Sequence, residues 1–203
     1  MFTRVPQPLA YAEALLAQFS ALSRAAQGAV LLEDFVRGAA QLSGCELSQL
    51  YLLDATHSCL QLRAECLGGL LQPREVINLP SDYSGEQLLQ FALCQNRVVS
   101  LVGLNHSLHD TSFLPVHSAA WQSLLCVPLV NARKAVEGLL LCASPQQQDL
   151  QAFAQSLGQL GAFVLGQWAL LQRLRLPAGE PAPLLPPEVI TSGYGLIGTS
   201  PAM

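Results

Sequence analysis

Charged side chains are scarce in this chain, and lysine is almost absent. Asp, Glu, Lys and Arg make up 12% of the 203 residues, the net charge is −4, and the ten basic residues include a single lysine. Proteins that bind nucleic acids neutralise phosphates with clustered Lys and Arg. Since the sequence has no such cluster, we expect no direct contact between this segment and DNA or RNA. Hydrophobic residues reach 51%, which excludes a chain that is disordered throughout.

Familiar cysteine motifs and targeting signals are missing as well. The closest of the six cysteines, Cys59 and Cys66, are separated by six residues, so zinc-ribbon and thioredoxin spacings are excluded. The N-terminal residues Met-Phe-Thr-Arg-Val-Pro-Gln-Pro contain no apolar run followed by a cleavage site, unlike a signal peptide. We therefore expect a cytoplasmic protein with reduced thiols.

No charged residue occurs between Asp149 and Arg173, a stretch long enough to span a bilayer. Its five glutamines and one serine would be costly to bury in lipid, so we expect no membrane contact. Apolar residues recur there at spacings typical of an amphipathic helix with a heptad-like seam. The candidate dimer contacts on this helix are Leu150, Phe153, Leu157, Leu160, Val164 and Leu171.

Hydrophobic periodicity predicts an α+β fold, with an antiparallel sheet of five or six strands and helices on one face. Leu60, Leu62, Ala64 and Cys66 alternate with polar residues, as in a strand with one wet face. The terminal helices would be available for dimerisation. The predicted helices cover 9–26, 28–42, 84–96 and a long segment from Ser144-Pro145 to about Leu176, and the predicted strands cover 47–53, 59–66, 97–101, 123–130 and 136–143.

Three segments resemble a GAF domain in order and spacing. They are Leu-Tyr-Leu-Leu-Asp at 50–54, Ser-Leu-Leu-Cys-Val-Pro-Leu at 123–129 and Val-Glu-Gly-Leu-Leu-Leu at 136–141. The turn between the last two contains Asn131 and no glycine, which departs from the family's usual turn. The resemblance covers roughly residues 28–172 and implies a domain that senses a signal.

Residues 195–203, Gly-Leu-Ile-Gly-Thr-Ser-Pro-Ala-Met, resemble the opening of the AAA+ ATPase domain of sigma-54-dependent transcriptional activators. No phosphate-binding Gly-x-x-x-x-Gly-Lys-Ser/Thr loop is present, so we expect the chain to be part of a longer protein and unable to hydrolyse ATP by itself. Five prolines between 177 and 187 predict a stiff linker. The expected organisation is an N-terminal helix (1–27), a GAF-like sensory domain (28–176), a Pro-rich linker (177–194) and the truncated start of the AAA+ domain (195–203).

The resemblance implies a non-enzymatic regulatory domain that controls its own AAA+ domain allosterically in response to a small molecule or a protein. The apolar seams of the terminal helices in turn predict a homodimer. In general character the chain is similar to activators of type VI secretion clusters. Two alternatives stay open, a GAF-fold thiol enzyme and a ligand-free dimerisation module. The sequence contains no catalytic motif such as Gly-x-Ser-x-Gly.

A GAF pocket would be lined by the inner face of the sheet and the 84–121 connection. No cofactor is expected. A small-molecule or metal ligand stays an alternative, because His106, His109, Asp110 and His117 could supply metal ligands. The same four residues could equally be surface or capping groups. Cys66, Cys126 and Cys142 fall in predicted strands and could be plain core or ligands of an iron–sulfur cluster. The pocket candidates are Phe91, Cys94, His106, His109, Asp110, Phe113, His117 and Trp121.

Overall fold

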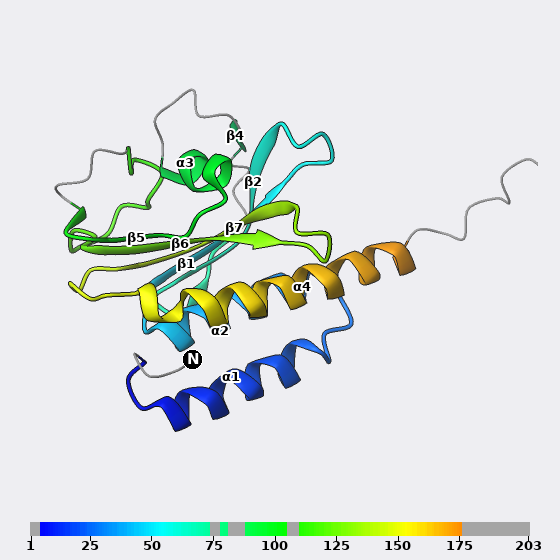
Figure 1. Cartoon of the computed structure of the whole chain (residues 1–203), viewed down its shortest axis with the longest axis horizontal. Coiled ribbons are helices and arrows are strands. Elements are labelled where there is room, and N and C mark those ends of the chain that lie inside the picture. The colour runs from blue at the N-terminus through cyan, green and yellow to red at the C-terminus, as the bar shows by residue number, and fades with distance from the viewer. Residues whose placement is uncertain (1–4, 74–77, 81–87, 105–109, 176–203) are drawn as a thin grey trace, which may run out of the picture.

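The computed structural model describes residues 5–73, 78–80, 88–104 and 110–175. They form stacked layers (Figure 1). A sheet carries two long helices, α2 and α4, on one face, and α1 packs as an outer layer on both of them. The short helix α3 lies on the opposite face of the sheet.

The helices and strands occur in separate runs, an order typical of α+β proteins. The helices are α1 (Pro8–Leu22), α2 (Gly28–Ser43), α3 (Leu88–Gln95) and α4 (Ala154–Arg175), the last preceded by a 3-10 turn at Gln151–Phe153. The strands are β1 (Leu47–Leu53), β2 (Cys59–Leu67), β3 (Leu70–Leu71), β4 (Asn78–Pro80), β5 (Val99–Val102), β6 (Ser123–Val130) and β7 (Val136–Ser144).

The sheet has the strand order β3-β2-β1-β7-β6-β5, β4 also pairs with β2, and all pairs are antiparallel. The central strand β1 pairs with β2 on one side and with β7 on the other. Gly138 of β7 lies opposite Leu52, and a Cβ atom at this glycine would lie 2.1 Å from the carbonyl oxygen of Tyr51. Only glycine allows the two strands to approach so closely at this point.

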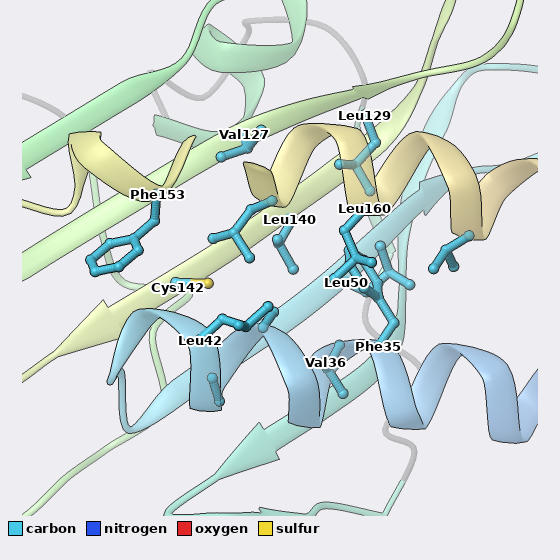
Figure 2. Packing of buried hydrophobic residues seen from close by; sticks show 14 of the residues in the cluster. Phe35, Val36, Leu42, Leu50, Val127, Leu129, Leu140, Cys142, Phe153 and Leu160 are labelled. Carbon is cyan, nitrogen blue, oxygen red and sulfur yellow. The ribbon is translucent and has the colours of Figure 1, made fainter. Parts of the chain in front are cut away.

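The larger core lies between the sheet and helices α2 and α4. Figure 2 shows Phe35 and Val36 of α2, Leu50 of β1, Leu140 of β7 and Leu160 of α4 in one apolar layer. Each of these side chains is buried. Helix α1 closes the layer from outside through two ring contacts, between Tyr11 and Phe153 (centroids 5.6 Å apart) and between Phe19 and Phe163 (5.3 Å).

A second core lies on the opposite face of the sheet. Leu88, Leu89 and Ala92 of α3 are buried there against strand residues that include Leu124 and Leu139. Because successive side chains of a strand point to opposite faces and both faces are covered, the central strands are apolar along most of their length. This is why β1, β6 and β7 appear as continuous hydrophobic runs in the sequence.

These findings confirm the predicted fold class and the five predicted strands, to which the short β3 and β4 are added. The three long helices share one face, as expected, while α3 covers the other. The linker and the AAA+-like segment, residues 177–203, lie outside the described residues. The predicted division of the chain at residue 27 stays a prediction.

The long helix begins later than predicted. Ser144 is the last residue of β7 and pairs with Ser123, so it does not begin the helix. Its hydroxyl accepts a hydrogen bond from the backbone N–H of Gln146 at 3.1 Å. The carboxylate of Asp149 accepts the N–H of Gln151 at 2.9 Å, which is how a side chain caps the first turn of a helix. The helical turns therefore begin after Asp149.

The prediction of one wet face for β2 is wrong in detail. The pairing of β1 with β2 passes from Leu50–Ala64 to Tyr51–Leu62, which leaves Arg63 as the extra residue of a bulge. A bulge shifts the alternation by one residue. Leu60 and Leu62 consequently face the core beneath α3, whereas Ala64 and Cys66 face α2 and α4.

The seam predicted for dimerisation covers the domain's own sheet. Five of its six members are at most 8% exposed within a single chain, and Leu171 is half-buried against the same core. The buried members are Leu150, Phe153, Leu157, Leu160 and Val164. These five side chains are therefore not available to a partner. The exposed apolar residues of the long helices are instead Leu9 and Leu16 of α1, Val30 of α2, and Leu170 and Leu174 of α4.

Candidate functional site

The face of the sheet beneath α3 carries a chain of polar side chains within an otherwise apolar surface. The hydroxyl of Tyr51 donates a hydrogen bond to Oε1 of Gln49 at 3.1 Å, and Nε2 of Gln49 donates to the carboxylate of Glu65. Gln49 and Tyr51 are two residues apart on β1 and so share a face, and Glu65 is the cross-strand partner of Gln49. These hydrogen bonds link the half-buried carboxylate of Glu65 to the fully buried phenol of Tyr51.

Burial sets the acidity of this phenol. Loss of solvent raises the pKa of Tyr51 far above its ordinary value, and the charges of Glu65 and Cys126 raise it further. Tyr51 therefore stays protonated and acts as a hydrogen-bond donor. With the amide of Gln49, it is one of the few polar groups buried on this otherwise apolar face.

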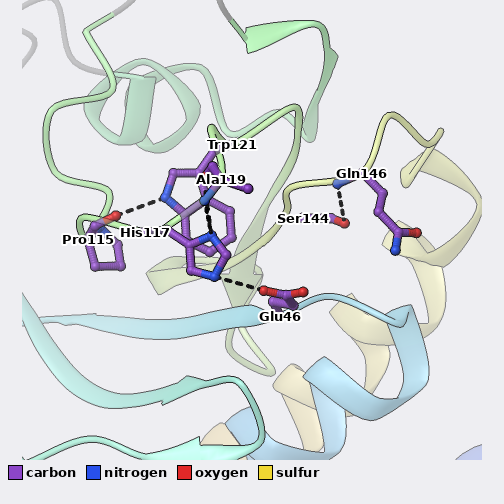
Figure 3. A network of polar contacts seen from close by, with 7 residues as sticks. All are labelled: Glu46, Pro115, His117, Ala119, Trp121, Ser144 and Gln146. Atoms are coloured by element: carbon purple, nitrogen blue, oxygen red, sulfur yellow. Dashed lines mark hydrogen bonds and ion pairs between the residues drawn. The ribbon is translucent and has the colours of Figure 1, made fainter.

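A second polar cluster closes the connection that leads into β6 (Figure 3). The indole N–H of Trp121 donates to the carbonyl oxygen of Pro115 at 2.9 Å, and the Trp121 ring lies against the His117 ring with centroids 4.7 Å apart. Nε2 of His117 lies 3.0 Å from the carboxylate of Glu46, and its Nδ1 accepts the N–H of Ala119 at 3.3 Å. Since both ring nitrogens are engaged, His117 braces this loop.

The remaining described candidates take different positions. Phe113 is half-buried against the core beneath α3, and Phe91 is half-buried on α3. Cys94 is exposed, because Leu88, Leu89 and Ala92 occupy the side of α3 that faces the sheet. The assignment of Cys94 to a pocket stays a prediction.

The histidine cluster is only partly described. His106 and His109 lie outside the described residues. Asp110 accepts hydrogen bonds from the backbone N–H and the hydroxyl of Ser112, both at 2.8 Å, as in a local turn. Within the described ranges no group of three or more His, Cys, Asp or Glu side chains is arranged to hold a metal ion.

The buried cysteines divide between the two faces of the sheet. Cys126 faces the core beneath α3, and burial raises the pKa of its thiol to about 12. Cys45 and Cys142 lie on the opposite face, close enough for each thiol to affect the pKa of the other. Their interaction lowers the pKa of Cys45 and raises the pKa of Cys142, so Cys45 ionises first. Cys66 is buried in the same helix-side core.

The sequence analysis missed Gln49 and Gln90. Both side chains are 1% exposed, Gln49 on β1 and Gln90 on α3. Gln90 has further interactions with its surroundings. The available signal was a single amide within a run of leucines, which is unusual because polar side chains are seldom fully buried.

Comparison with known proteins shows the GAF fold. No family model matches the chain, and no curated protein is a significant match. The GAF domain of an Acinetobacter phosphoenolpyruvate-protein phosphotransferase superposes with a TM-score of 0.65 at 23% identity, covering 80% of this chain and 94% of that one. The free methionine-R-sulfoxide reductase of Neisseria meningitidis, solved with its substrate, gives 0.65 at 18% identity, covering 86% and 97%.

A third structure, the A. aeolicus nlh2 GAF domain in an inactive state, gives a TM-score of 0.61 at 13% identity and covers 81% of this chain and 98% of that one. These similarities establish the fold of the chain. In addition, none of the helices described here combines the length and the apolar character needed to cross a bilayer.

Proposed function

We propose that this chain is the signal-sensing regulatory part of a sigma-54-dependent transcriptional activator and controls the ATPase of that protein. The observation that carries the proposal is the order of its parts. A GAF fold ends in the long helix α4. The sequence then continues through the proline-rich residues 177–194 to the AAA+-like residues 195–203. A shift in α4 would therefore be passed toward the ATPase.

The polar chain beneath α3 supports a sensing role. Gln49 and Tyr51 are buried in an apolar face and hydrogen-bonded to each other, so a polar small molecule would bind there by exchanging these hydrogen bonds for its own. A binding test follows thermal unfolding of the protein with a panel of metabolites, because a ligand that binds the native state raises the Tm by mass action. Gln49→Leu should abolish the shift, while the exposed Arg97→Gln should keep it. Equal shifts in both variants would place the ligand elsewhere.

The regulatory role is tested in the full-length activator. Deletion of residues 1–176 should change the rate of ATP hydrolysis several-fold, upward if the domain represses and downward if it activates. An unchanged rate would overturn the proposal. The type VI secretion setting rests on the general resemblance alone. If the protein acts in that setting, loss of its gene should abolish sigma-54-dependent transcription of a type VI secretion cluster. Unaffected transcription would contradict the type VI secretion role.

We further propose that the domain forms a homodimer through the outer face of α1. Leu9 and Leu16 are 75% and 69% exposed, and the exposed residues between them include Ala10 and Ala14. Leu16→Glu should convert the dimer to a monomer in analytical ultracentrifugation without loss of helical content. Val116→Glu, at a 99% exposed apolar position outside α1, is the matched control. A wild-type protein that is monomeric at tens of micromolar would exclude this dimer.

The likeness to a methionine sulfoxide reductase favours one alternative, a thiol enzyme. Such an enzyme needs thiols that converge where a substrate can reach them. The convergent pair, Cys45 and Cys142, is buried beneath α2 and α4. Thiol-dependent reduction of free methionine sulfoxide that is lost in Cys45→Ser would favour the enzyme over the sensor.

A further inference from the structure

A cleft of about 390 Å³ lies where the end of β1 and the β6–β7 turn meet the second half of α4. Small-molecule sites in proteins have volumes of about 300–1,000 Å³. Leu52, Leu165 and Trp168 give this cleft an apolar floor, and Arg133, Arg173 and Glu137 give it polar edges. None of the eight pocket residues predicted from the sequence lines it, so it is separate from the site beneath α3.

The two arginines of the cleft have no counter-ion among the described residues. Arg133 and Arg173 are both exposed, and neither takes part in an ion pair with the part of the chain that the structure describes. Only ten of the 203 residues are basic. The cleft therefore contains two of these ten basic side chains, and neither has an ion-pair partner among the described residues. The geometry of a guanidinium group suits carboxylate, sulfonate and phosphate oxygens.

The turn that carries Arg133 is held by Asn131. Its Oδ1 accepts the backbone N–H of Arg133 at 2.8 Å and that of Ala135 at 3.1 Å. Its Nδ2 donates to Oε1 of Glu137 at 2.6 Å. The amide thus fixes the backbone at the lip of the cleft and engages the one acidic side chain in the lining. Two arginines against one glutamate leave the cleft with a positive charge.

The aromatic wall is held by contacts with α2 and β2. A Cβ atom at Gly28 would lie 3.2 Å from Cδ1 of Trp168, which shows how closely the start of α2 approaches the indole. The guanidinium carbon of Arg63 lies 5.7 Å from the centroid of the same ring, within the range of a cation–π contact. An indole held in this way can pack against a flat ligand without losing much side-chain entropy.

We propose that this cleft binds a small planar organic anion, an aromatic carboxylate or sulfonate. The aromatic body packs on Trp168 and Leu165, and the anionic group lies between Arg133 and Arg173. The site needs neither an ATPase nor a dimer and is independent of the function proposed above.

The test uses anilinonaphthalene sulfonate as the probe and phenylnaphthylamine as its uncharged analogue, both with the full chain. The sulfonate should bind more tightly than the analogue, and its affinity should fall as the salt concentration rises. Arg133→Gln and Arg173→Gln should each weaken it roughly fivefold, the effect of one exposed charge contact. Arg97→Gln, an exposed arginine on β5's side of the domain, should leave affinity unchanged. Equal affinity for both probes, or no effect of either cleft variant, would overturn the proposal.

The two tryptophans provide an internal location control. In an NMR spectrum that resolves the indole N–H signals, addition of the sulfonate should shift the signal of Trp168 and leave that of Trp121 in place. A shift confined to Trp121 would place the probe beneath α3 and overturn the assignment. Glu180 and Glu188 are acidic residues in the segment that follows α4. If replacing both with glutamine tightened probe binding markedly, that segment would be the occupant instead of a small molecule.

Discussion

Leu160 provides the sharpest test of the assignment of the α4 seam to the domain's own core. Its side chain has no exposed surface and lies in the apolar layer with Leu50 and Leu140 (Figure 2). Leu→Ala at a buried site removes apolar contacts and leaves a cavity, at a cost of about 2–5 kcal/mol. Domains are stable by about 5–15 kcal/mol in total. Leu160→Ala should therefore remove a large fraction of the free energy of unfolding.

The assay is urea unfolding followed by circular dichroism at several protein concentrations. With a denaturant dependence of about 1–3 kcal/mol per molar urea, the midpoint should fall by ~1–2 M. Leu174→Ala, at an 81% exposed position of the same helix, is the matched control. It should change stability by no more than about 0.5 kcal/mol. The reasoning is refuted if the two variants shift the midpoint equally, or if the effect of Leu160→Ala disappears on dilution.

Three further predictions concern the strands and the buried thiols. Gly138→Ala should destabilise the domain by at least about 2 kcal/mol in the same urea assay, because its Cβ would meet the carbonyl oxygen of Tyr51; an unchanged midpoint would contradict the close approach. Exposed Cys94 should react with a thiol reagent in the native protein, whereas Cys126 and Cys142 should react only on unfolding; equal rates would exclude this burial. Because the pKa of Tyr51 is raised on folding, its contribution to stability is complete below pH ~10 and is lost as the pH rises toward the folded value; Tyr51→Phe should flatten this alkaline decline, and a slope as steep as in the wild type would refute it.

Local patterns were sufficient to predict much of the fold. The hairpin of β6 and β7 follows from two apolar runs joined by a short polar turn, and the stop of α2 follows from Gly44, which adopts φ 66°. Asn131 replaces the usual glycine of the hairpin turn because its side chain accepts two backbone N–H groups and Lys134 takes the left-handed conformation at φ 62°. The hairpin and the end of α2 could be predicted because both depend only on residues that are close together in the sequence.

The failures have a common physical cause, namely pairing across the fold. The bulge at Arg63 depends on how β1 meets β2, so no alternation within β2 alone could reveal it. The apolar seam of α4 has the same periodicity whether it covers a sheet or a partner helix. Exposure alone distinguishes the two, and it is a property of the folded chain. The cleft beside Trp168 combines segments from three parts of the sequence and has no local signature.

Two of the three glycines of α4, Gly158 and Gly161, determine which part of that helix can respond to a ligand. A Cβ atom at Gly158 would lie 3.4 Å from Val127, and one at Gly161 would lie 2.4 Å from Leu129. The helix is therefore packed closely against β6 in its first half, and closely packed elements move together because interiors deform little. Beyond Leu165 the exposed residues of α4 include Leu170 and Leu174. An occupant of the cleft contacts this second half, which can shift at a smaller loss of buried surface and which continues into the proline-rich segment.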